Sequence, residues 1–344
     1  MFHGFIYLRK REPFQTKPSN SAMGESERKR IIIDTDPGID DAMAILLALS
    51  SPEIEVIGLT TIFGNVYTNL ATKNALHLLE IAERTDIPVA EGAHSTLKKV
   101  LKVRIADFVH GSDGLGNQYF PPPQAKAIDQ SAAEFLVEKV NQYPGKITVV
   151  ALGPLTNIAM AMELDHKFSQ KVGQIVILGG AFAVNGNVNP AAEANVFGDP
   201  DASDIVFTSG ADILTVGINI THQVIMTDAD RDKLAKCEGK FAQYLCKILD
   251  CYFSYHMDAY AIQGIYLHDP TTIIAVVNPS LFTYTEGIVR VQTCGITKGL
   301  TIFDNTMKRF EGITDWSNKP KIKVAVTADT PAIFQLIMDR LMNS

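Results

Sequence analysis

From residue 31 onward, the chain alternates between short apolar runs and longer stretches whose apolar residues recur every three to four positions. Short β-branched runs are typical of buried strands, and the longer spacing is typical of amphipathic helices. Alternation of the two indicates βα units on a mostly parallel sheet that is covered on both faces. The predicted strands are 31–33, 54–63, 87–90, 147–152, 175–178 and 213–218, and the predicted helices are 68–84, 131–141, 156–164 and 200–208.

The pattern changes after residue 220. Residues 228–264 are predicted to be largely helical and are rich in Tyr and Phe. The segment that begins at His268-Asp269-Pro270 opens a further helix, and the last elements are a β-hairpin over 287–303, a strand over 321–326 and a helix over 331–342. No linker or repeat interrupts this order. We therefore predict one α/β domain with an open, mostly parallel, Rossmann-like sheet, helices on both faces and a helical cap near the active site.

The N-terminal segment differs in composition from the rest. Residues 1–30 contain seven Lys or Arg residues, two prolines and a Ser/Asn-rich patch. Such a composition favours a disordered arm, and a mitochondrial targeting segment is the alternative. We predict a flexible extension over 1–29 and a folded domain over 30–344, with Met23 as an alternative start.

Composition narrows the class of protein. The chain has 46% hydrophobic residues and a formal net charge of −7, and no basic block lies in its body. These values argue against nucleic acid or an anionic membrane as the main partner. No apolar run approaches the roughly 18 residues of a membrane span. The four cysteines form no C-x-x-C pair, which favours buried, reduced thiols, and we expect a cytoplasmic protein.

Four acidic residues fall within eight positions at the first strand-to-helix turn, in Asp34-Thr35-Asp36-Pro37-Gly38-Ile39-Asp40-Asp41. Helix capping accounts for one or two of them. Burial of the others without a positive partner would cost several kcal/mol or more. The spacing does not match an EF-hand, and hard carboxylate oxygens favour Ca²⁺ or Mg²⁺ over zinc. The turn is therefore predicted to bind a divalent cation.

Three other segments contain candidate functional side chains. In His268-Asp269-Pro270 the aspartate either caps a helix or adds an oxygen ligand to the metal, and the histidine is placed for proton transfer. The Asn-rich segment 185–195 is either a polar loop or a binding site for sugar hydroxyls. The Gly-rich segment 108–117 is predicted to be a flap whose His110 reaches the cleft. Ligands bind beyond the carboxyl ends of parallel strands, so the turns that follow four predicted strands are expected to converge in one cleft: 34–41, 64–65, 152–154 and the segment from 179 onward.

Taken together, these motifs resemble the signature of the inosine–uridine-type nucleoside hydrolases. The resemblance covers residues 31–340. It is carried by the opening D-T-D-P-G-I-D-D and by Gly64-Asn65-Val66, His110-Gly111, residues 152–157, residues 177–180, Gly186-Asn187-Val188, residues 192–195 and His268-Asp269-Pro270. It implies hydrolysis of the N-glycosidic bond of purine or pyrimidine ribonucleosides, such as inosine or uridine, to ribose and free base in nucleoside salvage or catabolism.

The resemblance also implies roles for particular residues. One Ca²⁺ per subunit would be held by Asp36, Asp41, Asp269 and the Leu152 carbonyl. Asp36 would also act as the general base, and His268 as the acid that protonates the departing base. The implied substrate-binding residues are Asp40, Asn65, His110, Asn187, Glu193 and Asn195. Candidate contacts to the leaving group are His256, Tyr260 and Gln263, and the expected assembly is a homodimer or homotetramer.

Two other functions fit parts of the same pattern. A Mg²⁺-dependent phosphatase of the haloacid-dehalogenase type also places D-x-D after a strand, but Gly38 stands where Thr or Val is expected. That alternative leaves the Asn-rich segment and His268 unexplained. A non-catalytic, Ca²⁺-dependent nucleoside-binding protein is the third hypothesis, and the filled catalytic positions disfavour it.

Overall fold

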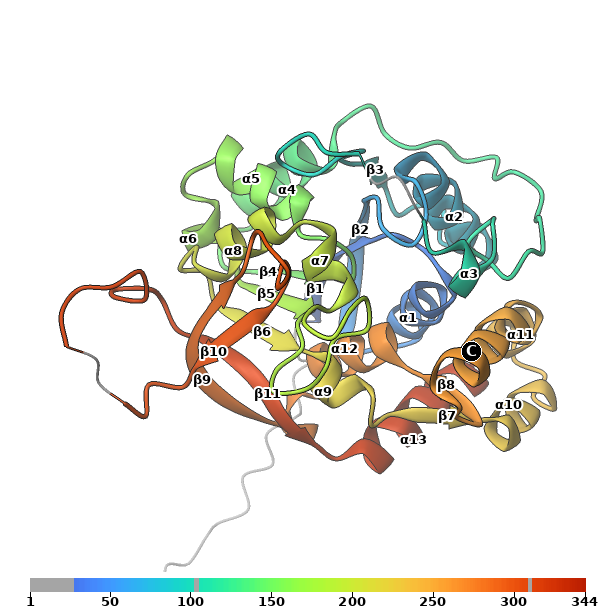
Figure 1. Ribbon diagram of the computed structural model, residues 1–344. Helices are drawn as coiled ribbons and strands as arrows, with labels where there is room; N and C mark the ends of the chain where they lie inside the picture. Colours follow the sequence, from blue (N-terminus) through green and yellow to red (C-terminus); the bar gives the residue numbers. More distant parts are fainter. Residues whose placement is uncertain (1–27, 102–104, 309–310) are drawn as a thin grey trace, which may run out of the picture.

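A nine-stranded sheet forms the centre of the computed structural model, which describes residues 28–101, 105–308 and 311–344 (Figure 1). The strand order is β10-β9-β11-β6-β5-β4-β1-β2-β3. All neighbours are parallel except β9, which runs antiparallel to β11 and β10. The bounds are β1 Lys29–Thr35, β2 Ile54–Thr61, β3 Val89–Glu91, β4 Ile147–Ala151, β5 Gln174–Leu178, β6 Ile213–Val216, β9 Phe282–Val291, β10 Thr301–Asp304 and β11 Ile322–Ala328.

The central strand β1 shows why the sheet is covered on both faces. Successive side chains of a strand point to opposite faces. Ile31 and Ile33 accordingly pack into one hydrophobic core, Ile32 packs into the other, and all three are fully buried. A strand that is apolar at every position can be satisfied only when helices cover both faces of the sheet.

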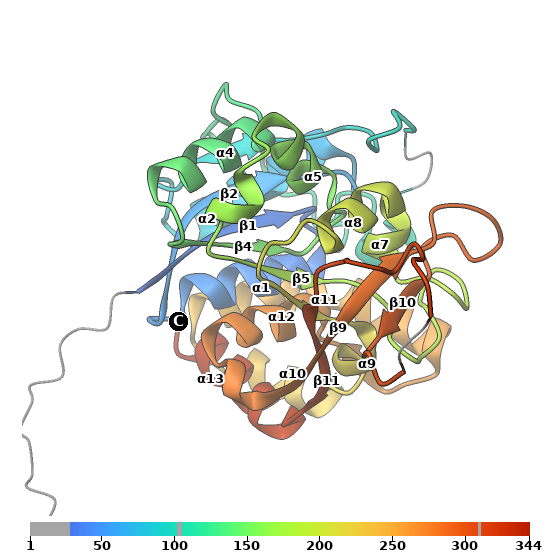
Figure 2. The same cartoon turned by 90° about the vertical axis from the view of Figure 1, so that its left-hand side faces the viewer.

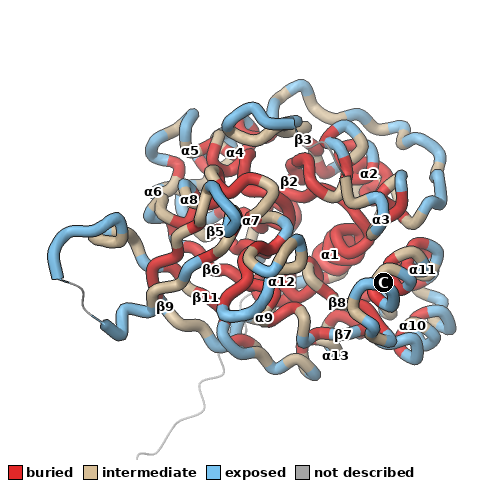
Figure 3. Tube along the Cα trace, in the orientation of Figure 1, coloured by how far each residue is buried: buried red, intermediate tan, exposed pale blue. Residues whose placement is uncertain are grey.

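Two helical layers provide that cover (Figure 2). On one face lie α1 Ile39–Leu49, α2 Thr68–Ile81, α11 Lys240–Tyr260, α12 His268–Val277 and α13 Thr330–Met342. On the other face lie α4 Ala132–Gln142, α5 Thr156–Leu164 and α8 Pro200–Phe207. Burial is concentrated in the sheet and in the inner sides of these helices, while the connecting segments are largely exposed (Figure 3).

A small cap stands beside the carboxyl end of the sheet. It consists of α10 Asp228–Ala235, α11, and the antiparallel pair β7 Ile225–Thr227 and β8 Gly264–Tyr266. Figure 1 shows this group next to α1 and α3. The remaining short elements are α3 Asp107–His110, α6 Phe168–Lys171, α7 Ala194–Gly198, α9 Ile218–Thr221 and the 3₁₀ helix η1 Pro279–Leu281.

The predicted fold class is confirmed, and several local predictions need correction. The strand expected over 213–218 ends at Val216, because Gly217 begins the short helix α9. The region 228–264 is largely helical, as predicted, and contains the two helices α10 and α11; its flanking strands β7 and β8 were not predicted. The hairpin expected over 287–303 is present, but its first strand begins at Phe282.

The predicted division at residues 29 and 30 stays a prediction. Residues 1–27 of the expected extension lie outside the described residues, and β1 begins one residue earlier than the proposed boundary, at Lys29. Within the described ranges, no helix has both the length and the apolar character that crossing a bilayer requires. All four cysteines are free thiols, but the expected burial is wrong: Cys294 is exposed, and the other three, Cys237, Cys246 and Cys251, are only half-buried.

Candidate active site

Turns that follow four neighbouring strands line one cavity of about 710 Å³ at the carboxyl edge of the sheet. Asp40 follows β1, Asn65 follows β2, Leu152 follows β4, and Glu193 lies after β5. Helix α11 and the start of α12 close the opposite side. The site thus occupies the place that parallel α/β sheets offer to ligands, as the sequence predicts.

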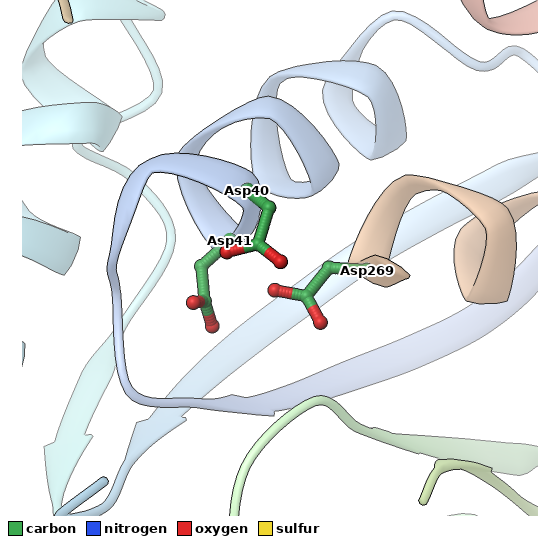
Figure 4. Close-up of side chains that lie close together, drawn as sticks. All are labelled: Asp40, Asp41 and Asp269. Atoms are coloured by element: carbon green, nitrogen blue, oxygen red, sulfur yellow. The ribbon is translucent and has the colours of Figure 1, made fainter. Parts of the chain in front are cut away.

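Three buried carboxylates meet between two helix N-termini. Asp40 and Asp41 stand in the first turn of α1, and Asp269 stands in the first turn of α12. Each offers an oxygen that lies within 4.8 Å of the other two, and none of the three is more than 6% exposed. Figure 4 shows the side chains of Asp40 and Asp269 directed toward each other, with that of Asp41 beside them. We call Asp40, Asp41 and Asp269 the carboxylate cluster.

The electrostatics of the cluster call for a positive partner. Burial, together with the charge of Asp41, raises the pKa of Asp40 to about 7. Burial also raises the pKa of Asp41, and burial and the neighbouring aspartates raise the pKa of Asp269 well above its usual value. In the described part of the chain, no Lys or Arg forms an ion pair with the three acids.

These donors suit a hard divalent cation. They are all carboxylate oxygens, which is the ligand type of Ca²⁺ and Mg²⁺. Asp40 Oδ1 is buried without a hydrogen-bond partner among the described residues. A buried acceptor without a partner lowers the stability of the folded protein unless a ligand, ion or water binds to it. The cluster therefore fits a metal ion on the chemistry of its own atoms.

Asp36, which the sequence predicts as a metal ligand, lies beside the cluster rather than within it. Its backbone N–H donates to Asp41 Oδ1 over 3.3 Å, and its charge raises the pKa of Asp269. Its Oδ2 accepts a hydrogen bond of 2.5 Å from the backbone N–H of Asn65. A Cβ on Gly64 or Gly153 would lie 1.8 or 2.6 Å from an Asp36 oxygen. Only glycine at both positions leaves room for this carboxylate.

Asn65 connects two of the predicted ligands. Its side-chain amide donates to Asp41 Oδ2 over 2.9 Å, while its backbone N–H binds Asp36. Asp41 Oδ1 accepts a further bond from the Thr35 hydroxyl. Asn65 lines the cavity, as expected for a substrate-binding residue, but its amide is engaged in orienting Asp41.

The Asn-rich segment is a braced turn rather than a loose loop. Glu193 caps α7 and accepts backbone bonds from Gly180, Asn195 and Val196. The Asn195 amide donates to the carbonyl oxygens of Leu152, at 2.7 Å, and Leu178, at 3.2 Å. All of the predicted ribose contacts of this segment line the cavity: Asn187, Glu193 and Asn195.

Two predicted histidines also line the cavity. The Nδ1 of His110 accepts a bond of 3.1 Å from the backbone N–H of Ile39 and lies 4.0 Å from Asp40 Oδ1. His268 is placed next to the cluster, and its Nδ1 contacts the Thr221 hydroxyl at 2.7 Å. Burial lowers the pKa of His268 well below its usual value, so its ring is neutral near pH 7.

Helix α11 supplies an aromatic wall of the cavity, of which the sequence gave His256 and Tyr260 as candidates but not Tyr252. Tyr252, His256 and Tyr260 lie four residues apart on α11 and therefore share one face. Tyr252 donates to Asp40 Oδ2 over 3.2 Å, and Phe108 of α3 adds to the wall. The i, i+4 spacing would have indicated Tyr252. The third leaving-group candidate, Gln263, is exposed and does not line the cavity.

Comparisons with known proteins identify what this arrangement is similar to. The sequence model of the family described as "inosine-uridine preferring nucleoside hydrolase" matches residues 31–335. The chain is 70% identical to "Probable uridine nucleosidase 2" of Arabidopsis thaliana, covering 94% of this chain and 100% of that protein. It is 52% identical to "Uridine nucleosidase 1" of the same plant, over 92% of this chain and 94% of that one.

A solved structure has the same fold. "Plant nucleoside hydrolase - PpNRh1 enzyme" superposes with a TM-score of 0.91 at 59% identity, covering 92% of this chain and 100% of that one. These relatives are ribonucleoside-cleaving enzymes by their names. The findings favour neither the phosphatase nor the non-catalytic hypothesis.

Proposed function

Because the chain belongs to the inosine-uridine preferring nucleoside hydrolase family and is a nucleoside hydrolase acting on ribonucleosides, we propose that it cleaves uridine with the help of one Ca²⁺ per subunit. The carboxylate cluster is the observation that carries the calcium proposal, since three buried acids share one space without a Lys or Arg partner in the described residues. The names of the two plant relatives support uridine.

Asp36, Asp41, Asp269 and the Leu152 carbonyl are the proposed ligands, with Asp40 close enough to join them. A bound Ca²⁺ would supply Lewis acidity toward a water and the ribose hydroxyls. Asp36 would accept the proton of the attacking water. Its tight enclosure between two glycines supports this role, because it limits the rotamers that the carboxylate can adopt.

Ribose recognition is proposed for the acids and amides of the opposite turns. Asp40, Asn187, Glu193 and Asn195 line the same cavity, and each hydroxyl of a sugar both donates and accepts. The transition state of glycosidic cleavage resembles an oxocarbenium ion. Fixed anionic and amide groups around the sugar would stabilise the positive charge that develops at C1′.

His268 is the proposed acid for the leaving base. The ring is neutral near pH 7, so it can donate only through a ring N–H. If the Thr221 hydroxyl donates to Nδ1, the proton resides on Nε2, away from Thr221 and available to the base. Tautomer control of this kind is the usual function of a second hydrogen bond to a histidine.

His256 supports a preference among bases. Its Nδ1 lies 2.9 Å from the Tyr252 carbonyl oxygen, which can only accept, so the ring proton is on Nδ1. Its Nε2 is then an acceptor, and it is buried without a partner among the described residues. Within a nucleoside, uracil and hypoxanthine each carry a ring N–H that could donate to this atom, whereas the rings of cytosine and adenine carry none. We propose that His256 favours uridine and inosine over cytidine and adenosine.

The test is ribose release from uridine, inosine, cytidine and adenosine by protein treated with EDTA and then supplied with Ca²⁺. We expect uridine to be cleaved only after Ca²⁺ is restored. Full activity in the chelated protein, verified to be free of metal by elemental analysis, would contradict the calcium proposal. Faster cleavage of cytidine than of uridine would contradict the role of His256.

The biological setting remains a proposal as well. A salvage or catabolic role, a cytoplasmic location and a homodimer or homotetramer are the expectations that accompany this activity. Light scattering of the purified full chain measures the assembly directly.

A further inference from the structure

The segment Asp34–Asp41 brings like charges together in a tight turn, and something must hold it in that shape. It contains two members of the carboxylate cluster and the proposed base, Asp36. Mutual repulsion of these acids favours a more open turn whenever the cation is absent. Two buried asparagines from different helices contact this segment at separate points, and neither belongs to the proposed ligands.

Asn157 holds the beginning of the segment. It lies at the start of α5, is 1% exposed, and donates to Asp34 Oδ1 over 2.8 Å and to the Thr61 carbonyl over 2.9 Å. Its Oδ1 accepts from the Ala93 backbone N–H at 2.9 Å. A Cβ on Gly92 would lie 2.3 Å from that oxygen. One side chain therefore connects the carboxyl ends of β1 and β2 with the segment after β3.

Asn74 holds the middle of the segment. It lies in α2, is 4% exposed, and donates to the Pro37 carbonyl over 3.0 Å and to the Asp113 carbonyl over 2.9 Å. Asp113 belongs to the Gly-rich segment that also contains His110, and His110 accepts the backbone N–H of Ile39. Asn74 thus ties the acidic turn to a second wall of the cavity.

The amide is the group best suited to this task. It offers two N–H donors without charge, so it satisfies buried oxygens and leaves the nearby acids negative. A Lys or Arg in the same place would compete with a cation for those acids. Loss of the Asn157 amide would remove a donor from the Thr61 carbonyl and leave Asp34 Oδ1 with the Thr60 hydroxyl as its remaining donor. Loss of the Asn74 amide would remove a donor from the Pro37 and Asp113 carbonyls. Movement of the turn relieves such losses.

We propose that Asn157 and Asn74 are positioning residues that hold the Asp34–Asp41 turn in its metal-binding shape before the metal arrives. The metal-binding part of this inference rests on the calcium proposal above. The asparagines act through the acids and touch neither the cation nor the nucleoside. A preorganised site binds its cation more tightly, because a smaller free-energy cost of ordering the turn is incurred on binding.

The experiment measures metal affinity separately from stability. Asn157→Leu and Asn74→Leu keep the size of the side chain and remove its donors. The control is Ser51→Ala, which removes a buried bond of 2.7 Å to the Leu47 carbonyl at the far end of α1. Each full-length protein is freed of metal by chelation, its Tm is recorded, and Ca²⁺ is titrated by calorimetry.

We expect the Kd for Ca²⁺ to rise at least tenfold in both asparagine variants and to stay within twofold of wild type in Ser51→Ala. All three variants are expected to lower the Tm. Asn74→Leu should also raise the KM for uridine at saturating Ca²⁺, because it releases the turn that orients His110, whereas Asn157→Leu should leave that KM near wild type. A Tm loss without a change in Kd would assign both asparagines a merely structural role and overturn the proposal.

Two further outcomes are separable. If wild type binds no Ca²⁺, the calcium proposal is wrong, and positioning is then judged from uridine cleavage. A tenfold loss of kcat in both asparagine variants but not in Ser51→Ala supports positioning, and equal kcat values overturn it. If a leucine variant does not fold, the Asn→Asp variant at the same position, which also removes the donors, is expected to shift the same quantities in the same direction.

Discussion

At the scale of single residues, enclosure decides how each acid or imidazole can act. Asp36 is confined between Gly64 and Gly153, while Asp40 keeps a buried oxygen without a partner among the described residues. His256 is held in one tautomer by a backbone carbonyl. Side chains of the same type therefore have different proposed roles, because their surroundings differ.

Replacement of Asp36 by alanine tests the proposed base. We expect kcat for uridine to fall by about 10²–10⁴-fold, the usual contribution of a general base, together with weaker Ca²⁺ binding. The matched control is Asp86→Ala, which removes an exposed acid that pairs with Arg84 and should keep wild-type kcat. Near-wild-type turnover of the Asp36 variant at saturating Ca²⁺ would rule out this assignment.

Replacement of His256 by leucine tests the proposed base preference. Burial lowers the pKa of His256 to about 4, so the ring is neutral at pH 7 and its Nε2 can accept. Since one buried hydrogen bond is worth about 1 kcal/mol, kcat/KM for uridine should fall about five- to tenfold, with cytidine much less affected. His94→Leu, at an exposed site, is the control. Equal losses for both nucleosides would show that His256 only supports the helix.

At the scale of elements, α11 forms one wall of the cavity through a repeated four-residue spacing. Such a face can be read from the sequence because it depends on local periodicity. Strands β7 and β8 could not be predicted in the same way, since each has three residues and exists only through pairing across about forty residues of chain. The end of α11 has a second non-local feature, because Ala261 adopts a left-handed conformation with φ of 54°.

Glycine at that C-terminal position should stabilise the protein. A left-handed conformation costs a non-glycine residue about 1–2 kcal/mol, and part of this gain is offset by the greater freedom of glycine in the unfolded chain. We therefore expect Ala261→Gly to raise the free energy of unfolding by about 0.5–1 kcal/mol in urea denaturation. Ala242→Gly, at a fully buried position in the first turn of the same helix, should lower it by about 1 kcal/mol or more. A loss of stability in Ala261→Gly would contradict the strain argument.

At the scale of the whole molecule, the sheet brings acids from turns far apart in the chain into one electrostatic unit. Asp269 lies more than two hundred residues from Asp40, yet their carboxylate oxygens share one cluster and the charge of Asp40 raises the pKa of Asp269. The raised pKa values mean that the metal-free protein holds protons on the carboxylate cluster above the ordinary pKa of 3.8, and for Asp40 this range extends to about 7. The raised pKa values of these acids therefore stabilise the folded metal-free protein at low pH, and this stabilisation is lost as the pH rises through that range.

The stabilisation by Ca²⁺ should consequently grow with pH. At pH 5.5 the cation must displace protons from the cluster, whereas at pH 7.5 fewer remain to be displaced. We expect 1 mM Ca²⁺, on the order of a weak protein site's Kd, to raise the Tm of chelated protein more at pH 7.5 than at pH 5.5. Sodium chloride at matched ionic strength is the control, and Asp269→Asn should abolish the difference. A Tm shift of the same size at both pH values would argue against metal binding at these acids.

The sequence alone determined the layered α/β architecture and the residue types of the site. Strand and helix periodicity are local properties, and apolar runs such as Ile31–Ile33 demand cover on both faces. The edge of the sheet where the turns converge follows from the direction of parallel strands, so Asp40, Leu152 and Glu193 were expected in one cleft, whereas Asp269 was predicted as a further oxygen ligand of the metal.

Only the tertiary structure decided which of these residues form the oxygen cluster and which ones orient it. It brings Asp40 rather than Asp36 into the closest group of oxygens, engages the Asn65 amide with Asp41, and places Asn74 and Asn157 against the acidic turn. Such contacts form only when segments far apart in the chain are positioned relative to each other with high precision. Those positions are set by packing of the whole core, which local sequence patterns do not encode.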